Sequence, residues 1–199
     1  FPELVQQLQE CIQWLISMGD RGELQCRGCI APCWLVGFVT SLAFCALRAE
    51  ESIPGGRLVY AAALLGHTAA LQHLLLVSPL AARASDQTGA TPLHVAAASR
   101  HSQGVQLLLA AAPDTASMED MQHRLAIHIA AESGDAAAVA ALLAANPASA
   151  AQPDRHFGRN ALHFAAISGQ AAVVQLLLAA APELALSRQH LYGLTALHL

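Results

Sequence analysis

A short phrase recurs through the chain at a nearly constant spacing, and this period limits the fold more than any other feature. Its clearest copy is Gly-Ala-Thr-Pro-Leu-His-Val-Ala-Ala over residues 89–97. With His94 as the origin, the equivalent residues follow in steps of 34, 34, 35 and 35 and are Tyr60, His94, His128, His163 and His198. Such a period indicates an array of small repeated units rather than a closed globular domain.

Three further features keep the same register. In every complete unit two alanines follow the origin by two and three residues, two leucines by fourteen and fifteen, and a proline by nineteen. The prolines are Pro79, Pro113, Pro147 and Pro182. We therefore expect four complete units and a partial fifth, over residues 55–88, 89–122, 123–157, 158–192 and 193–199.

The residues of one unit predict a pair of helices. Thr91 supplies an N-cap hydroxyl, and Pro92 stands at the first helical position, where a missing N–H is no loss. Leu93 and the alanines form a narrow apolar stripe. A glycine six residues after the origin ends this first helix in three units, at Gly66, Gly134 and Gly169. A second helix carries the leucine pair and ends at the recurring proline. Polar turn sequence precedes the next unit, with aspartates at Asp86, Asp120 and Asp154.

Over residues 55–199 the chain resembles an ankyrin-repeat protein, whose unit of about 33 residues carries a T-P-L-H-x-A signature. The signature positions are Thr91, Pro92, Leu93, His94, His128, His163, Thr195 and His198. The resemblance implies an all-α solenoid of helix-turn-helix pairs joined by short β-turn or hairpin loops. It also implies that the histidines are structural and tie each turn to the start of its helix. Three departures are Tyr60 for histidine, Leu125-Ala126 for Thr-Pro, and Arg100 for glycine.

Residues 1–54 form a flank outside the repeats. An amphipathic helix is predicted from Pro2 to Ile16, where it would cap the array. Residues 30–47 then run for 18 residues without a charge, which is the lower limit for crossing a bilayer. Three interpretations stay open for this segment: a buried flanking helix, a membrane or signal-like segment, and a gene-model artefact. Because the chain starts at Phe1 and stops within the fifth copy, we expect it to be a fragment.

All five cysteines lie in the same flank. Cys26 and Cys29 have the spacing of half a zinc site, but a structural site needs four ligands. Free thiols in a reducing compartment are the default, so the cytoplasm is the expected location, with membrane association as the alternative. A net charge of −4 without a local basic face argues against a nucleic-acid partner.

Ten histidines raise the question of metal binding or catalysis. Equivalent histidines of successive units should be separated by the packing distance of helices, about 8–10 Å, whereas ligands of one zinc ion lie about 2 Å from it. Equivalent histidines therefore cannot share a metal ion, and the same argument applies to the turn residues His123, His156 and His190. With no lysine for a Walker-type loop and no nucleophile beside a base, we expect no metal, cofactor, small-molecule substrate or catalysis.

The remaining candidate is a binding surface for a protein partner. In the family that the chain resembles, the turn tips and the exposed side of the first helix line a concave face that binds proteins. Because interface hot spots favour aromatic residues and arginine, the candidate patch is Arg124, Phe157, Arg159, Ile167 and Tyr192. Two alternatives are an array tethered to a membrane through Ile30–Leu47, and a regulatory region of a larger enzyme.

Overall fold

The computed structural model describes residues 56–189 and 193–199. Eight α-helices occur in this part of the chain: α3 Gly56–Leu65, α4 Thr68–Val77, α5 Pro92–Ala98, α6 Ser102–Ala111, α7 Ala126–Ser133, α8 Ala136–Ala145, α9 Ala161–Ile167 and α10 Ala171–Ala180. Five short 3-10 helices accompany them: η1 Pro79–Arg83, η2 Pro113–Ser117, η3 Pro147–Ala150, η4 Pro182–Leu186 and η5 Ala196–His198. Consecutive α-helices pair, as the repeat predicts.

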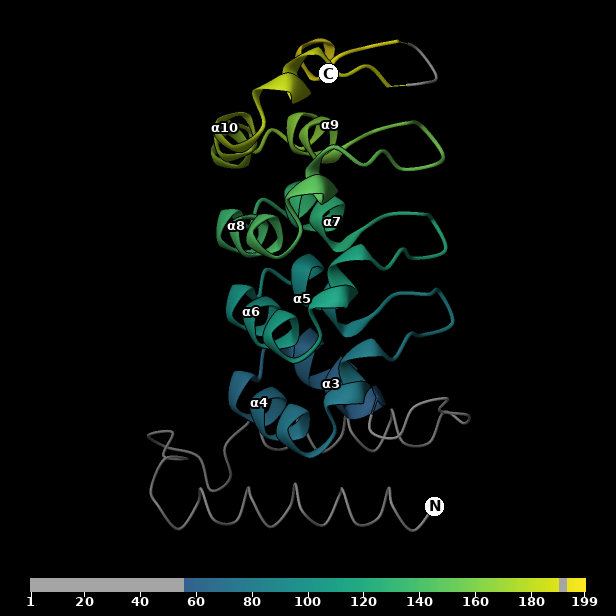
Figure 1. Cartoon of the computed structure of the whole chain (residues 1–199), viewed down its shortest axis with the longest axis vertical. Coiled ribbons are helices and arrows are strands. Elements are labelled where there is room, and N and C mark those ends of the chain that lie inside the picture. The colour runs from purple at the N-terminus through teal and green to yellow at the C-terminus, as the bar shows by residue number, and fades with distance from the viewer. Residues whose placement is uncertain (1–55, 190–192) are drawn as a thin grey trace, which may run out of the picture.

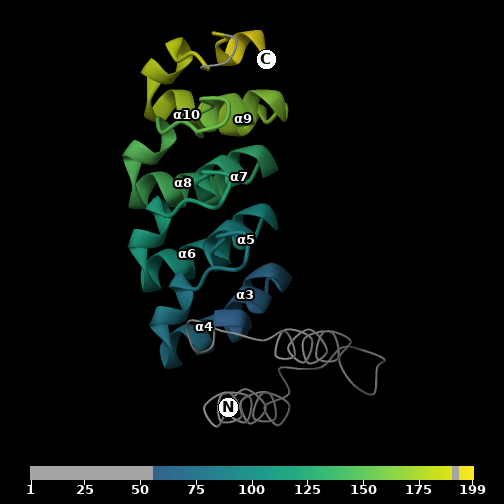
Figure 2. The same cartoon turned by 90° about the vertical axis from the view of Figure 1, so that its right-hand side faces the viewer.

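The helix pairs stack along one axis (Figures 1 and 2). Helices α3, α5, α7 and α9 form one column, and α4, α6, α8 and α10 form a second column beside it. The turns between units project from the side of the first column (Figure 1). No strand is assigned within the described residues, although Arg188 and Thr195 form an antiparallel bridge. The predicted all-α repeat solenoid is confirmed.

The predicted start of the first helix is confirmed in the best copy, and its predicted end is confirmed in the units that carry the glycine. Thr91 is the N-cap of α5, with extended backbone, and Pro92 is its first residue. In the units that carry a glycine six residues after the origin, the backbone is left-handed there, as at Gly134 with φ of 82°. Arg100 adopts the same conformation with φ of 59°, so the replacement of glycine leaves the path of the chain unchanged.

The recurring proline has a role that the sequence interpretation gave only in part. Each second helix ends two residues before the proline, and the proline then begins a 3-10 helix. Proline suits that position because the first N–H of a helix has no partner within it. The chain therefore makes one more tight turn before the next unit.

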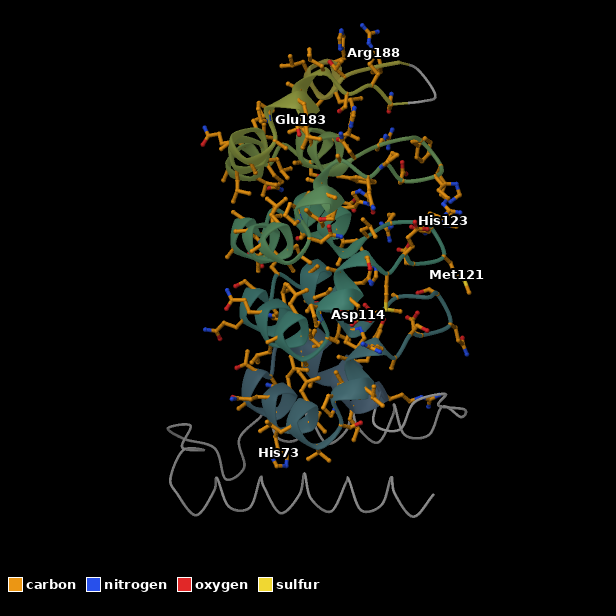
Figure 3. The ribbon with its side chains drawn as sticks, viewed as in Figure 1. His73, Asp114, Met121, His123, Glu183 and Arg188 are labelled. Atoms are coloured by element: carbon orange, nitrogen blue, oxygen red, sulfur yellow. The ribbon has the colours of Figure 1, made fainter. Side chains whose placement is uncertain are left out.

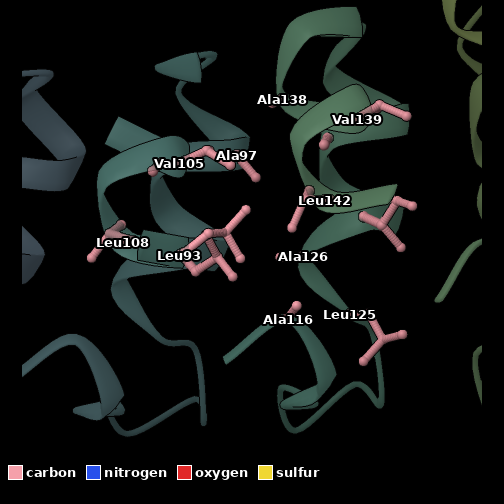
Figure 4. Packing of buried hydrophobic residues seen from close by; sticks show 14 of the residues in the cluster. Leu93, Ala97, Val105, Leu108, Ala116, Leu125, Ala126, Ala138, Val139 and Leu142 are labelled. Carbon is pink, nitrogen blue, oxygen red and sulfur yellow. The ribbon is translucent and has the colours of Figure 1, made fainter. Parts of the chain in front are cut away.

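The core lies between the two columns and between successive units (Figure 4). The exposed fraction is 1% or less for Leu93, Leu108 and Leu142, and most of the paired alanines are equally buried. Small alanine side chains let the helices of one column approach closely. Because the apolar stripe of each unit is covered by its neighbours, the stack has one continuous core rather than separate ones.

The first described unit departs from the pattern at its start. Helix α3 begins at Gly56, four residues before Tyr60, whereas α5 begins two residues before His94. The predicted capping helix Pro2–Ile16 and the apolar segment Ile30–Leu47 lie outside the described residues. None of the described helices is both long enough and apolar enough to span a bilayer.

Candidate protein-binding surface

His94 and His128 hold the turns to their helices, and each ring also reaches a backbone carbonyl beyond its own helix pair. The ring of His94 accepts the Thr91 N–H at Nδ1 over 3.2 Å, and its Nε2 lies 3.1 Å from the Arg124 carbonyl of the next unit. Since a backbone N–H can only donate, Nδ1 is the acceptor and Nε2 donates to the carbonyl. His128 repeats the arrangement with the Leu125 N–H and the Gln152 carbonyl.

These rings are kept uncharged by their surroundings. Burial lowers the pKa of His94, and the Arg124 carbonyl and the Asp120 carboxylate oppose this effect only in part. Burial likewise lowers the pKa of His128 and of His163. A neutral imidazole with one acceptor and one donor nitrogen is the form that this hydrogen-bond pattern requires.

The departures from the motif keep the connection by other means. The Tyr60 hydroxyl donates to Asp86 Oδ2 over 2.9 Å, which links the first unit to the following turn in place of a histidine. In the fourth unit Asn160 caps α9 by accepting the His163 N–H at Oδ1 over 3.2 Å. His198 keeps only the local contact, with Nδ1 2.8 Å from Thr195 Oγ1.

An aspartate carboxylate shapes three of the projecting turns, and Gln189 takes the aspartate position in the last one. Asp120 Oδ1 accepts the backbone N–H groups of Gln122 and Arg124, both at 2.8 Å. Asp154 Oδ1 accepts the Arg159 N–H at 2.6 Å in the same way. The predicted aspartate turns are thus hairpin-like loops in which the carboxylate satisfies backbone donors. These hydrogen bonds fix the backbone that carries the side chains at the tips of the turns.

Four of the five candidate surface residues lie in the described part of the chain. Phe157 is 40% exposed, and the guanidinium of Arg159 lies 4.4 Å from the centre of its ring. Arg159 Nε also donates to Gln189 Oε1 of the next turn over 3.1 Å. Ile167 is 46% exposed at the end of α9. Tyr192 lies outside the described residues.

Arg124 shows which helix surface adjoins the turns. Its guanidinium contacts Asp120 at 3.1 Å in the turn and Glu132 at 3.7 Å in the last turn of α7. The turn and the end of the first helix therefore share one side of the unit. Arg159 and Ile167 hold the equivalent positions of the fourth unit, which places them on the same side as Arg124 and Glu132.

A family model described as ankyrin repeats (3 copies) matches the chain over residues 58–154 and again over residues 127–199. These overlapping matches span well over half of the sequence. The chain belongs to the ankyrin-repeat family. Ankyrin repeats generally mediate protein–protein interaction and are typically non-catalytic. A search of curated proteins found no match.

One prediction about the turns of this ankyrin array is wrong. The rings of His123 and His156, from successive turns, lie only 6.3 Å apart between centroids, closer than the helix spacing used to separate them. Turn side chains can lean towards one another because neither is fixed to a packed helix. Glu119, which the sequence interpretation did not select, accepts from His123 Nδ1 over 2.8 Å. No group of three or more histidine, cysteine, aspartate or glutamate side chains suited to a metal ion occurs within residues 56–189 and 193–199.

Proposed function

We propose that this ankyrin array is a non-catalytic module that binds a protein partner through the turns of its third and fourth units and the adjoining ends of α7 and α9. The interaction surface consists of Arg124, Phe157, Arg159 and Ile167, with Tyr192 as a further candidate from the next turn. The observation that carries the proposal is the pair of the exposed Phe157 ring and the half-buried Arg159, whose guanidinium lies over the face of that ring.

Preorganisation supports this assignment. Arg159 is oriented by Phe157 on one side and by Gln189 on the other. Arg124 is oriented by Asp120 and Glu132. Ordering a long side chain at an interface costs about 0.5–1.5 kcal/mol, and a side chain that is already held loses less freedom on binding. Arginine and aromatic residues also dominate the binding energy of most interfaces.

The test is affinity capture from the source cell with the Phe157→Ala and Arg159→Ala variants, quantified by mass spectrometry against the unaltered chain. A hot-spot residue contributes about 2 kcal/mol or more, so capture of the specific partner should fall by at least about tenfold. The matched control is Arg83→Ala, because Arg83 is an exposed arginine paired with Asp114 on a 3-10 helix outside the surface.

Circular dichroism should show the same helical content for all three variants. If the two surface variants capture every partner as well as the Arg83 variant does, the proposed surface is wrong. If all three lose the partner equally, the loss reflects general charge or folding rather than this surface.

A further inference from the structure

The turn of the third unit carries a histidine at a position that glycine takes elsewhere. The residue that closes the hairpin by donating its N–H back across the turn is Gly89, Gly158 or Gly193 in the other described units, each with positive φ. In the third unit this residue is His123, with φ of 55°. A left-handed conformation is unfavourable for a residue with a Cβ atom, and such strain gathers at functional positions.

The strained position places the imidazole at the outer tip of the turn (Figure 3). Its side chain is 39% exposed, and Glu119 Oε2 accepts from Nδ1 over 2.8 Å. With Nδ1 directed at a carboxylate, Nε2 is the nitrogen available to a ligand. A histidine oriented by a carboxylate in this way is the arrangement found around protein-bound zinc, where the carboxylate fixes the ring and raises its basicity.

The second imidazole comes from the next projecting turn along the chain. The ring of His156 lies 6.3 Å from that of His123 between centroids, with an angle of 51° between the ring planes. Two imidazoles that bind one zinc ion through nitrogen at about 2.0–2.1 Å have centroids about 5 Å apart. The remaining difference is about 1 Å, and both imidazoles stand on turns rather than on packed helices.

We propose that His123 and His156 together bind one divalent transition-metal ion across the tips of the third and fourth turns. Imidazole ligands select zinc, copper or nickel over magnesium and calcium. Water completes the coordination, because the described residues offer no third ligand at this place. Arg155, with Nη2 3.5 Å from the Glu119 carboxylate, adds a positive charge that lowers the affinity for a cation.

The test is calorimetric titration of the full chain with zinc chloride. The cysteines are alkylated first, because thiolates are themselves zinc ligands and the five thiols of residues 1–54 would otherwise compete for the ion. Two variants each remove one imidazole, His123→Asn and His156→Gln; asparagine tolerates the left-handed backbone of the turn. Each variant should bind one zinc ion fewer than the unaltered chain. His73→Gln is the matched control, since His73 lies on α4 at one end of the described array, away from the His123 turn, and its loss should leave the zinc stoichiometry unchanged (Figure 3).

Glu119→Gln separates orientation of the ring from direct binding. Loss of a carboxylate behind a ligating histidine weakens metal affinity by about 10–100-fold, so this variant should keep the ion at reduced affinity. In the unaltered chain, zinc should shift the ¹⁵N resonance of His123 Nε2 and a ring nitrogen of His156 together.

Retention of the full zinc stoichiometry by either His123→Asn or His156→Gln overturns the proposal, as does a zinc response of one ring without the other. Because no protein partner enters this experiment, failure of the metal site leaves the proposed protein-binding role standing. Failure of the protein-capture test likewise has no bearing on the metal site, which the zinc titration alone tests.

Discussion

Replacement of His128 by alanine should remove a junction between two repeats. The ring accepts the Leu125 N–H at 3.1 Å, lies 2.8 Å from the Gln152 carbonyl, and stacks on Phe164 with centroids 5.3 Å apart. Leu125 is 2% exposed, so its N–H would be left without water or protein acceptor, at a cost of about 1–3 kcal/mol. Loss of the ring stack adds about 0.5–1.5 kcal/mol. The Gln152 carbonyl belongs to an exposed residue and regains water, so the expected total is about 3 kcal/mol.

His198 provides the matched control in the same chain. Its ring makes the equivalent local contact, accepting the Thr195 N–H at Nδ1 over 3.4 Å, but the side chain is exposed. His198→Ala should therefore lower the free energy of unfolding by less than about 1 kcal/mol. Urea denaturation followed by circular dichroism at pH 7.5 measures both variants. Equal losses in the free energy of unfolding from the two substitutions would show that the buried contacts of His128 between units do not account for its stabilising effect.

Three further outcomes follow from the same geometry. Burial lowers the pKa of His94 and His128 in the folded state, so the unfolded state binds more protons as pH falls below about 6.5. The free energy of unfolding should therefore fall from pH 7.5 towards pH 5, by up to about 1.4 kcal/mol per pH unit for each histidine. A pH-independent free energy of unfolding in urea melts would contradict the assignment of both rings as neutral. Gly134→Ala should be more destabilising than Gly169→Ala in the same assay. Both substitutions add a Cβ atom to left-handed backbone, but only at Gly134 does this atom meet another side chain, that of Gln170. Equal losses of stability would show that this contact has no cost. Arg100→Gly should raise the free energy of unfolding by about 1 kcal/mol, because glycine adopts the positive φ of this position without strain. A free energy of unfolding below that of the unaltered chain would mean that the arginine side chain stabilises the fold by more than its backbone conformation costs.

The helices of this protein could be predicted because their signals are local. Thr91 followed by Pro92 fixes the start of α5 through the backbone of two adjacent residues, and Gly134 ends α7 through its own φ. At least one of these two signals is present in every complete unit. The 3-10 helices after the prolines were missed because a proline that ends one helix is also well suited to begin another.

The connections between units were harder to predict because they join residues that hold different positions in the repeat. The Tyr60 hydroxyl reaches Asp86 only because a longer side chain replaces the histidine. His123 and His156 approach one another because their turns differ in length and conformation, which the spacing of helices does not describe. Side-chain reach and turn geometry, rather than the period, decide such contacts. The proposed surface residues were chosen by residue type and repeat position, and their role stays a prediction.

The central claim is that the partner docks on the projecting turns rather than on the outer helices. The most direct measurement places a photo-crosslinking amino acid at Arg155, an exposed turn residue beside the surface, or at Gln175, an exposed residue of α10 in the other column. We predict that irradiation with the captured partner gives a covalent adduct from position 155 and none from position 175. An adduct from position 175 alone would contradict the account.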